Sequence, residues 1–122
     1  MNATSRLTAA ELKRFRLVSV DTNGKIVHCP AGGACVGSLQ EGGAGGVFAA
    51  DTPVSPDAIE VGKEVTLEAG EALAIGEFFK AGAYGGNDGY AVKDATKSVD
   101  TLGEVRSTAS AAGAKFRAEY TR

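Results

Sequence analysis

The fold is decided by the stretch Gly32-Gly33-Ala34-Cys35-Val36-Gly37-Ser38-Leu39-Gln40-Glu41-Gly42-Gly43-Ala44-Gly45-Gly46-Val47-Phe48-Ala49-Ala50. Short apolar pieces alternate here with glycine, which predicts a strand, a glycine loop and a second strand. A weaker copy occupies residues 101–120 and has Leu102-Gly103 where the first has Val36-Gly37. Two such segments in one chain favour a fold built from short strands.

The composition agrees with an all-β domain. The chain has 122 residues, 17 glycines, three prolines and no tryptophan, and its apolar residues are scattered. We expect one compact β-barrel or β-tulip-like domain of about eight or nine short strands. The sequence has no apolar run of membrane-spanning length and no apolar signal-peptide core, so we expect no membrane partner.

Two hairpins are predicted. The turn Asp21-Thr22-Asn23-Gly24 separates strands at 15–20 and 25–29, because Asn-Gly supplies the positive φ that a tight turn needs. A second hairpin joins residues 77–81 to 90–93. The sequence separation between Gly24 and Gly89 is nearly equal to that between Val36 and Leu102, which suggests an internal duplication. The alternative is chance similarity between glycine-rich β segments.

Neither unit has enough apolar residues for its own core, so the two are expected to share one. The predicted core residues are Leu17, Val20, Ile26, Val36, Leu39, Val47, Val65, Leu67, Leu73, Ile75, Val92, Leu102, Val105 and Phe116.

Residues 1–14 are interpreted as an N-terminal arm and residues 15–122 as the β domain. Residues 1–5 are small and polar, which favours a segment that is flexible or ordered by a partner. Thr8-Ala9-Ala10-Glu11 has the spacing of a capping box and predicts one helical turn ending near Arg14. The apolar side chains of this segment, Leu7, Leu12 and Phe15, must dock on their own domain or on a neighbouring subunit.

The charge is unevenly distributed. Residues 1–28 carry five basic and two acidic side chains, whereas residues 29–79 carry eight acidic side chains and one lysine. Without interleaved aromatic residues the basic segment is a weak nucleic-acid footprint. We therefore expect an acidic protein surface as its partner and no direct nucleic-acid contact.

The sequence offers little for catalysis or metal binding. Cys29 and Cys35 are interpreted as two thiols, with a disulfide-closed turn or half of a metal site as alternatives, and His28 is the only histidine. His28 and Cys29 are adjacent strand residues and point to opposite faces, so they make a poor nucleophile and base. We expect no metal, no cofactor and no enzymatic activity.

Four phrases together resemble the capsid cement or head decoration proteins of tailed bacteriophages. They are Val61-Gly62-Lys63-Glu64-Val65, the run from Ala69-Gly70-Glu71 to Gly76-Glu77-Phe78-Phe79, Leu102-Gly103-Glu104-Val105, and Ala111-Ala112-Gly113-Ala114-Lys115-Phe116. The resemblance implies a non-enzymatic protein, made in the host cytoplasm and located in the virion on the outer capsid surface. It implies binding to the major capsid protein, stabilisation of contacts between capsid subunits, and a homotrimer.

Given that resemblance, we expect residues 1–16 to bind the capsid. We also expect that deleting residues 2–14 leaves the β domain folded. The candidate capsid-binding residues are Arg6, Leu7, Leu12, Lys13, Arg14, Phe15 and Arg16. Two other classes remain open. One is a barrel-sandwich carrier domain displaying Lys25, and the other is a small ligand- or glycan-binding β module with Tyr84 and Tyr90 in a groove.

Overall fold

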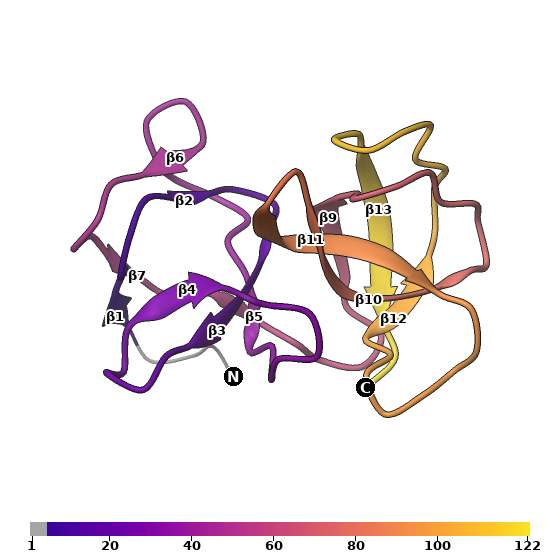
Figure 1. Ribbon diagram of the computed structural model, residues 1–122, viewed down its shortest axis with the longest axis horizontal. Coiled ribbons are helices and arrows are strands. Elements are labelled where there is room, and N and C mark those ends of the chain that lie inside the picture. Colours follow the sequence, from indigo (N-terminus) through magenta and orange to yellow (C-terminus); the bar gives the residue numbers. More distant parts are fainter. Residues whose placement is uncertain (1–4) are drawn as a thin grey trace.

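The computed structural model describes residues 5–122, and this part of the chain is all β (Figure 1). Its thirteen strands are β1 (Arg6–Leu7), β2 (Leu12–Lys13), β3 (Leu17–Val20), β4 (Ile26–His28), β5 (Gly37–Ser38), β6 (Val47–Phe48), β7 (Pro53–Val54), β8 (Asp57–Ala58), β9 (Glu64–Glu68), β10 (Phe78–Tyr84), β11 (Asn87–Asp94), β12 (Gly103–Val105) and β13 (Lys115–Tyr120). The described part has no helix long and apolar enough to cross a membrane.

The strands form four antiparallel sheets. Two have two strands each, β1-β7 and β2-β6; the others have the orders β4-β3-β5-β8 and β11-β10-β12-β13-β9. The predicted all-β single domain is confirmed. The expected barrel closure does not occur, because many strands end after two or three residues and none of these sheets returns to its first strand.

The sheet orders show that two units of the same topology follow one another. The order β4-β3-β5-β8 is repeated by β11-β10-β12-β13, to which β9 is added. We call residues 6–58, from β1 to β8, the first unit and residues 64–120, from β9 to β13, the second unit. They form the left and right lobes of Figure 1.

The register of the pairs repeats too. Leu12 pairs with Phe48 in the first unit, and Leu73 pairs with Ala109 in the second. Leu73 follows Leu12 by the same number of residues as Ala109 follows Phe48. Leucine is the first member of both pairs, whereas its partner changes from Phe48 to Ala109. The duplication suggested by the glycine spacing is therefore confirmed by the strand pairing.

One pair of glycines has the same steric role in both units. A Cβ added at Gly37 would lie 2.0 Å from the carbonyl oxygen of Asp57, and one added at Gly103 would lie 2.0 Å from the carbonyl oxygen of Glu119. In each unit the glycine lets a neighbouring strand approach where any side chain would collide with its backbone. These are the glycines of the Val36-Gly37 and Leu102-Gly103 landmarks.

Both predicted hairpins are present. In the β3-β4 turn the Asp21 carboxylate accepts hydrogen bonds from the backbone N–H groups of Asn23 and Lys25, and Gly24 has a φ of 78°. The β10-β11 strands are longer than predicted and meet at Gly85-Gly86. The opening stretch differs from its prediction, because β5 and β6 pair with other strands instead of with each other.

The N-terminal segment is extended, and the predicted helical turn is wrong. Thr8 makes a parallel bridge with Ile26, as Ala69 does with Ala91 in the second unit, and the Thr8 hydroxyl donates to the Ala49 carbonyl at 2.7 Å. One helical turn is marginal alone, so strand pairing prevails over the cap signal. β1 and β2 thus pair within the first unit; residues 1–4 lie outside the described residues.

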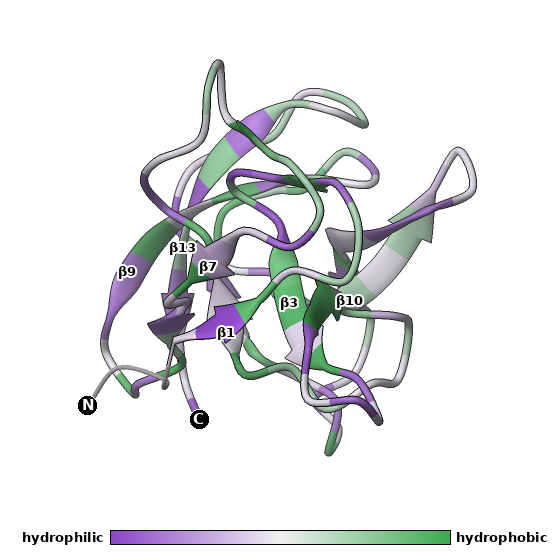
Figure 2. Cartoon of the chain, turned by 90° about the vertical axis from the view of Figure 1, so that its left-hand side faces the viewer, coloured by the Kyte–Doolittle hydropathy of each residue, from purple (hydrophilic) through white to green (hydrophobic). Residues whose placement is uncertain are grey.

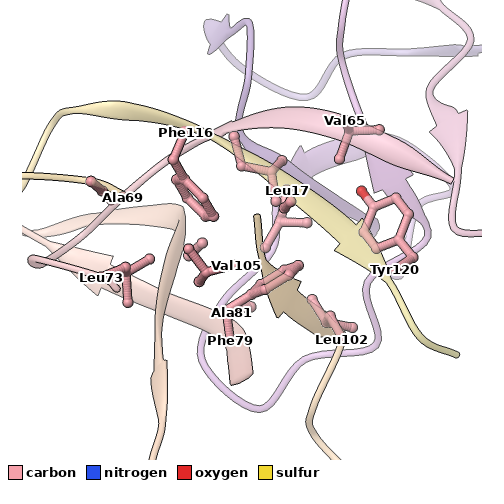
Figure 3. Close-up of a cluster of buried hydrophobic side chains, with 14 of the residues drawn as sticks. Leu17, Val65, Ala69, Leu73, Phe79, Ala81, Leu102, Val105, Phe116 and Tyr120 are labelled. Carbon is pink, nitrogen blue, oxygen red and sulfur yellow. The ribbon is translucent and has the colours of Figure 1, made fainter. Parts of the chain in front are cut away.

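The hydrophobic core consists of two clusters instead of one. Leu12, Val18, Ile26, Leu39, Phe48 and Val54 form the smaller cluster, inside the first unit. The larger cluster lies in the second unit but includes Leu17 (Figure 3). It also includes Cys29. Leu17 and Val18 are neighbours in β3 and point to opposite faces, so this strand, coloured hydrophobic in Figure 2, contributes to both clusters.

Not every predicted core residue is buried. Val20 is 37% exposed and Ile75 is 65% exposed, while Val36, Val47 and Val92 are half-buried. The aromatic residues Phe79 and Tyr120, which the prediction omitted, are fully buried and lie against each other with ring centroids 6.5 Å apart. Large aromatic side chains in the longer strands of the second unit thus form much of the core.

The junction between the units is held by polar contacts. The side-chain amide of Gln40 donates to the Thr66 carbonyl at 2.8 Å and accepts from the Thr66 N–H at 3.0 Å. Thr66 belongs to β9, at the edge of the five-stranded sheet, so the Gln40 side chain takes the place of another strand there. The hydroxyl of Tyr120, in the second unit, donates to the Ser38 hydroxyl of the first unit at 3.4 Å.

Candidate functional site

The seven predicted contact residues fall into three groups. Arg6, Leu7 and Lys13 are exposed, Arg14 and Phe15 are half-buried, and Leu12 and Arg16 are buried. Leu12 packs in the core of the first unit and so docks on its own domain, which was one of the two alternatives. The surface available to a partner is therefore formed by the other five residues that are not buried.

Arg16 holds the two units together instead of facing solvent. Its Nε lies 2.8 Å from a Glu68 carboxylate oxygen, its guanidinium donates to the Tyr90 hydroxyl, and its Cζ lies 4.0 Å from the Tyr90 ring centroid. Only 6% of the Arg16 side chain is exposed. A charge buried to this degree needs a partner, and Glu68 of the second unit is that partner.

Phe15 has an unusual backbone. Its φ is 68°, in the left-handed region, and Asp51 is the only other non-glycine residue with a positive φ in the described part of the chain. Phe15 donates to the Leu39 carbonyl at 2.7 Å; at the equivalent place in the second unit Gly76, with a φ of 89°, donates to Val105. The second unit thus uses glycine where the first strains a phenylalanine.

A shallow cavity opens beside this phenylalanine. Its volume is about 220 Å³, and it is lined by Lys13, Arg14, Phe15, Gly45, Gly46, Val47, Glu68 and Lys115. We call it the Phe15 cavity. It is smaller than the roughly 300–1,000 Å³ of pockets that bind drug-sized ligands, so its size suits a single side chain or small ion.

Cations surround the Phe15 ring. The Arg14 Cζ lies 4.8 Å and the Lys115 Nζ 5.8 Å from the ring centroid, so both make cation–π contacts. Lys115 comes from β13 of the second unit. The sequence prediction missed Lys115 because it lies one hundred residues beyond Phe15. Aligning the two halves of the chain would have placed Phe15 opposite Gly76, and this is the one signal that could have marked the site.

His28 lies beside this region but is not suited to acid–base work at neutral pH. Burial and the Arg16 cation lower the pKa of His28 to about 4, so its ring is neutral. The His28 Nε2 accepts the Lys13 backbone N–H at 3.1 Å, which needs the neutral ring. Its neighbour Cys29 is bonded to Cys35 in a disulfide and has no free thiol.

The disulfide corrects the interpretation of the cysteines as two thiols. Cys29 and Cys35 lie at either end of the loop between β4 and β5, with Cα atoms 5.7 Å apart. No cluster of three or more His, Cys, Asp or Glu side chains that could hold a metal occurs among residues 5–122.

The residues on which the carrier-domain and ligand-binding interpretations depended contact other side chains of the protein. Tyr90 is buried beneath Arg16, and its ring meets Tyr84 edge to face with centroids 5.5 Å apart, so the two do not form an open aromatic groove. The Lys25 Nζ lies 3.2 Å from an Asp51 carboxylate oxygen.

Comparison with known proteins shows the fold. No family model matches the chain, and no curated protein matches it in sequence. Among solved structures, the chain is similar to the N base of the head fiber protein gp8.5 of bacteriophage phi29, with a TM-score of 0.75 and 14% identity. The match covers 99% of this chain and 95% of that one, so the two share one fold throughout.

Proposed function

We propose that this protein is a non-enzymatic decoration or cement protein of a tailed-phage head. It binds the outer surface of the assembled head and stabilises contacts between major capsid subunits. The observation that carries the proposal is the fold shared with the phi29 head fiber base over 99% of the chain. Because fold alone does not fix function, the surface must supply a means of attachment.

The exposed part of the N-terminal segment supports the proposal. Leu7 is 42% exposed on β1 next to the exposed Arg6, and Lys13 is exposed on β2, so the segment offers both an apolar and a basic side chain to a partner. Leu12 and Arg16 would act from inside, by fixing the backbone that presents the other five candidates. Deletion of residues 2–14 would remove β1, β2 and a core leucine, so single substitutions are the better test.

Co-sedimentation with expanded heads that lack the protein tests the proposal. We expect saturable binding at a fixed number of copies per head, and decorated heads should withstand heating that disrupts bare ones. Unexpanded heads serve as the matched control for a surface that forms on maturation. Protein that remains in the supernatant over the whole concentration range would overturn the proposal.

We also propose a homotrimer as the form bound to the head. A closed cyclic assembly buries the same patch on every subunit, which suits a lattice with three-fold positions. Sedimentation velocity gives the state of the free protein, and a reconstruction of decorated heads gives the state on the shell. Isolated single copies in that reconstruction would contradict the trimer.

A further inference from the structure

We infer that the Phe15 cavity is a binding site for a carboxylate, supplied by an Asp or Glu side chain of an acidic capsid segment. This inference rests on the proposed function for the identity of the partner. It rests on the cavity itself for the chemistry.

The backbone at Phe15 provides the first argument. The equivalent Gly76 shows that this turn needs a left-handed residue, and glycine adopts that conformation without strain. A phenylalanine kept at a cost in strain indicates that its ring is needed, and strained residues gather at functional sites. The residues before it differ in the same direction: Lys13 and Arg14 correspond to Ala74 and Ile75 in the second unit.

The cations of the cavity provide the second argument. Lys13, Arg14 and Lys115 form no ion pair within the described part of the chain, and the buried Arg14 Nε has no hydrogen-bond partner there. The one acid in the lining, Glu68, is already paired with Arg16. The lining therefore has excess positive charge and an unused buried donor, which an anion would satisfy.

The shape of the site favours a carboxylate on a protein. Gly45 and Gly46 form one wall without side chains, and the Phe15 ring holds both the Arg14 guanidinium and the Lys115 ammonium. Three cations around one small cavity fit a single anionic group. A nucleic-acid backbone would need a longer basic track, and the chain as a whole has a net charge of −2.

Three variants separate the roles of the site. Arg14→Gln with Lys115→Gln removes the charges, and Phe15→Gly removes the ring while adopting the residue that the second unit uses. Lys97→Ala is the matched control, because Lys97 is an exposed lysine 5.8 Å from the ring of Phe78, outside the cavity lining. We expect Phe15→Gly and the double variant to weaken head binding about tenfold or more, with unchanged circular dichroism, and Lys97→Ala to bind as the wild type does.

A titration of the free protein followed by NMR tests the chemistry without heads. The probes are a short poly-glutamate peptide, inorganic phosphate and a DNA duplex. We expect the peptide to shift the Phe15, Gly46 and Lys115 signals, and the double variant to lose these shifts. Binding of phosphate alone, or tighter binding of DNA than of peptide, would overturn the carboxylate assignment.

The carboxylate site and the proposed function can be refuted separately. If the wild type binds heads and the double variant binds equally well, the inference is wrong and the proposed function stands. If the wild type does not bind heads but the peptide still shifts the cavity signals, the carboxylate site stands and the assignment of a capsid segment as its partner is wrong. If the peptide gives no shift at millimolar concentration, the carboxylate site is wrong.

Discussion

Replacing Gly37 or Gly103 by alanine should destabilise the fold severely and by similar amounts. Each added Cβ would lie 2.0 Å from a carbonyl oxygen of the neighbouring strand, and that oxygen belongs to rigid backbone. Real Cβ contacts essentially never fall below 3.0 Å, so the strands would have to separate by about 1 Å at that point.

The expected cost follows from what such a separation breaks. Two backbone hydrogen bonds at about 1 kcal/mol each and misfit of about 1–3 kcal/mol give a loss of roughly 3–5 kcal/mol. A domain of this size has about 5–15 kcal/mol in total, so a large part of its stability would be lost. With a urea slope of about 1–3 kcal/mol per molar, the unfolding midpoint should fall by more than about 1 M.

Urea unfolding followed by far-ultraviolet circular dichroism measures the effect. Gly113→Ala is the control: Gly113 has a φ of 85° but no atom within 4 Å of an added Cβ, so only backbone strain of about 1 kcal/mol applies. If Gly37→Ala and Gly103→Ala lose no more stability than Gly113→Ala, the steric argument is refuted. If only one of them loses stability, the equivalence of the two units at this position is refuted.

Three further outcomes are expected. Arg16→Ala should cost about 3 kcal/mol in the same unfolding assay, because it leaves the Glu68 carboxylate, which is only 17% exposed, without its partner; a loss near zero would mean that the ion pair does not hold the junction. The folded pKa of His28, about 4, lies below its ordinary 6.5, so this group should not affect the free energy of unfolding above pH 6.5. The free energy of unfolding should then fall as the pH drops from 6.5 to 4. His28→Gln should flatten this part of the plot of stability against pH, and an unchanged plot would contradict the burial of His28. Cys35→Ser should lower stability by about 2 kcal/mol, the loop-closure entropy of a short loop, and a reducing agent should then have no further effect on the variant.

The local hairpins could be predicted from sequence because turn chemistry is local. Asp21 to Gly24 contains both the Asn-Gly pair and the carboxylate that caps the turn. The duplication was visible at the glycines for a similar reason, since steric demand leaves no choice of residue. The strands β1 and β2 were missed because each has only two residues, which is too short for a clear alternating pattern, and because the cap spacing at Thr8 gave a competing local signal.

The site could be predicted only in part. Lys13, Arg14 and Phe15 were among the predicted contact residues, as basic side chains and an apolar side chain of one short segment, and the structure places all three in one cavity lining. Lys115 could not be found in this way, because its position depends on how the second unit packs on the first. The burial of Arg16 depends likewise on Glu68, a partner that lies 52 residues away in the chain.

The Gln40 side chain that occupies the edge of β9 bears on how the protein behaves when crowded. An open strand edge offers unpaired N–H and C=O groups to any passing strand, and copies packed side by side would be prone to join through it. Thr66 has both of its groups taken by Gln40, and the next outward-facing donor, the Glu68 N–H, is bound by the Phe15 carbonyl at 2.8 Å. The five-stranded sheet is thereby blocked from growing along this edge, so β9 cannot pair with a strand of another copy.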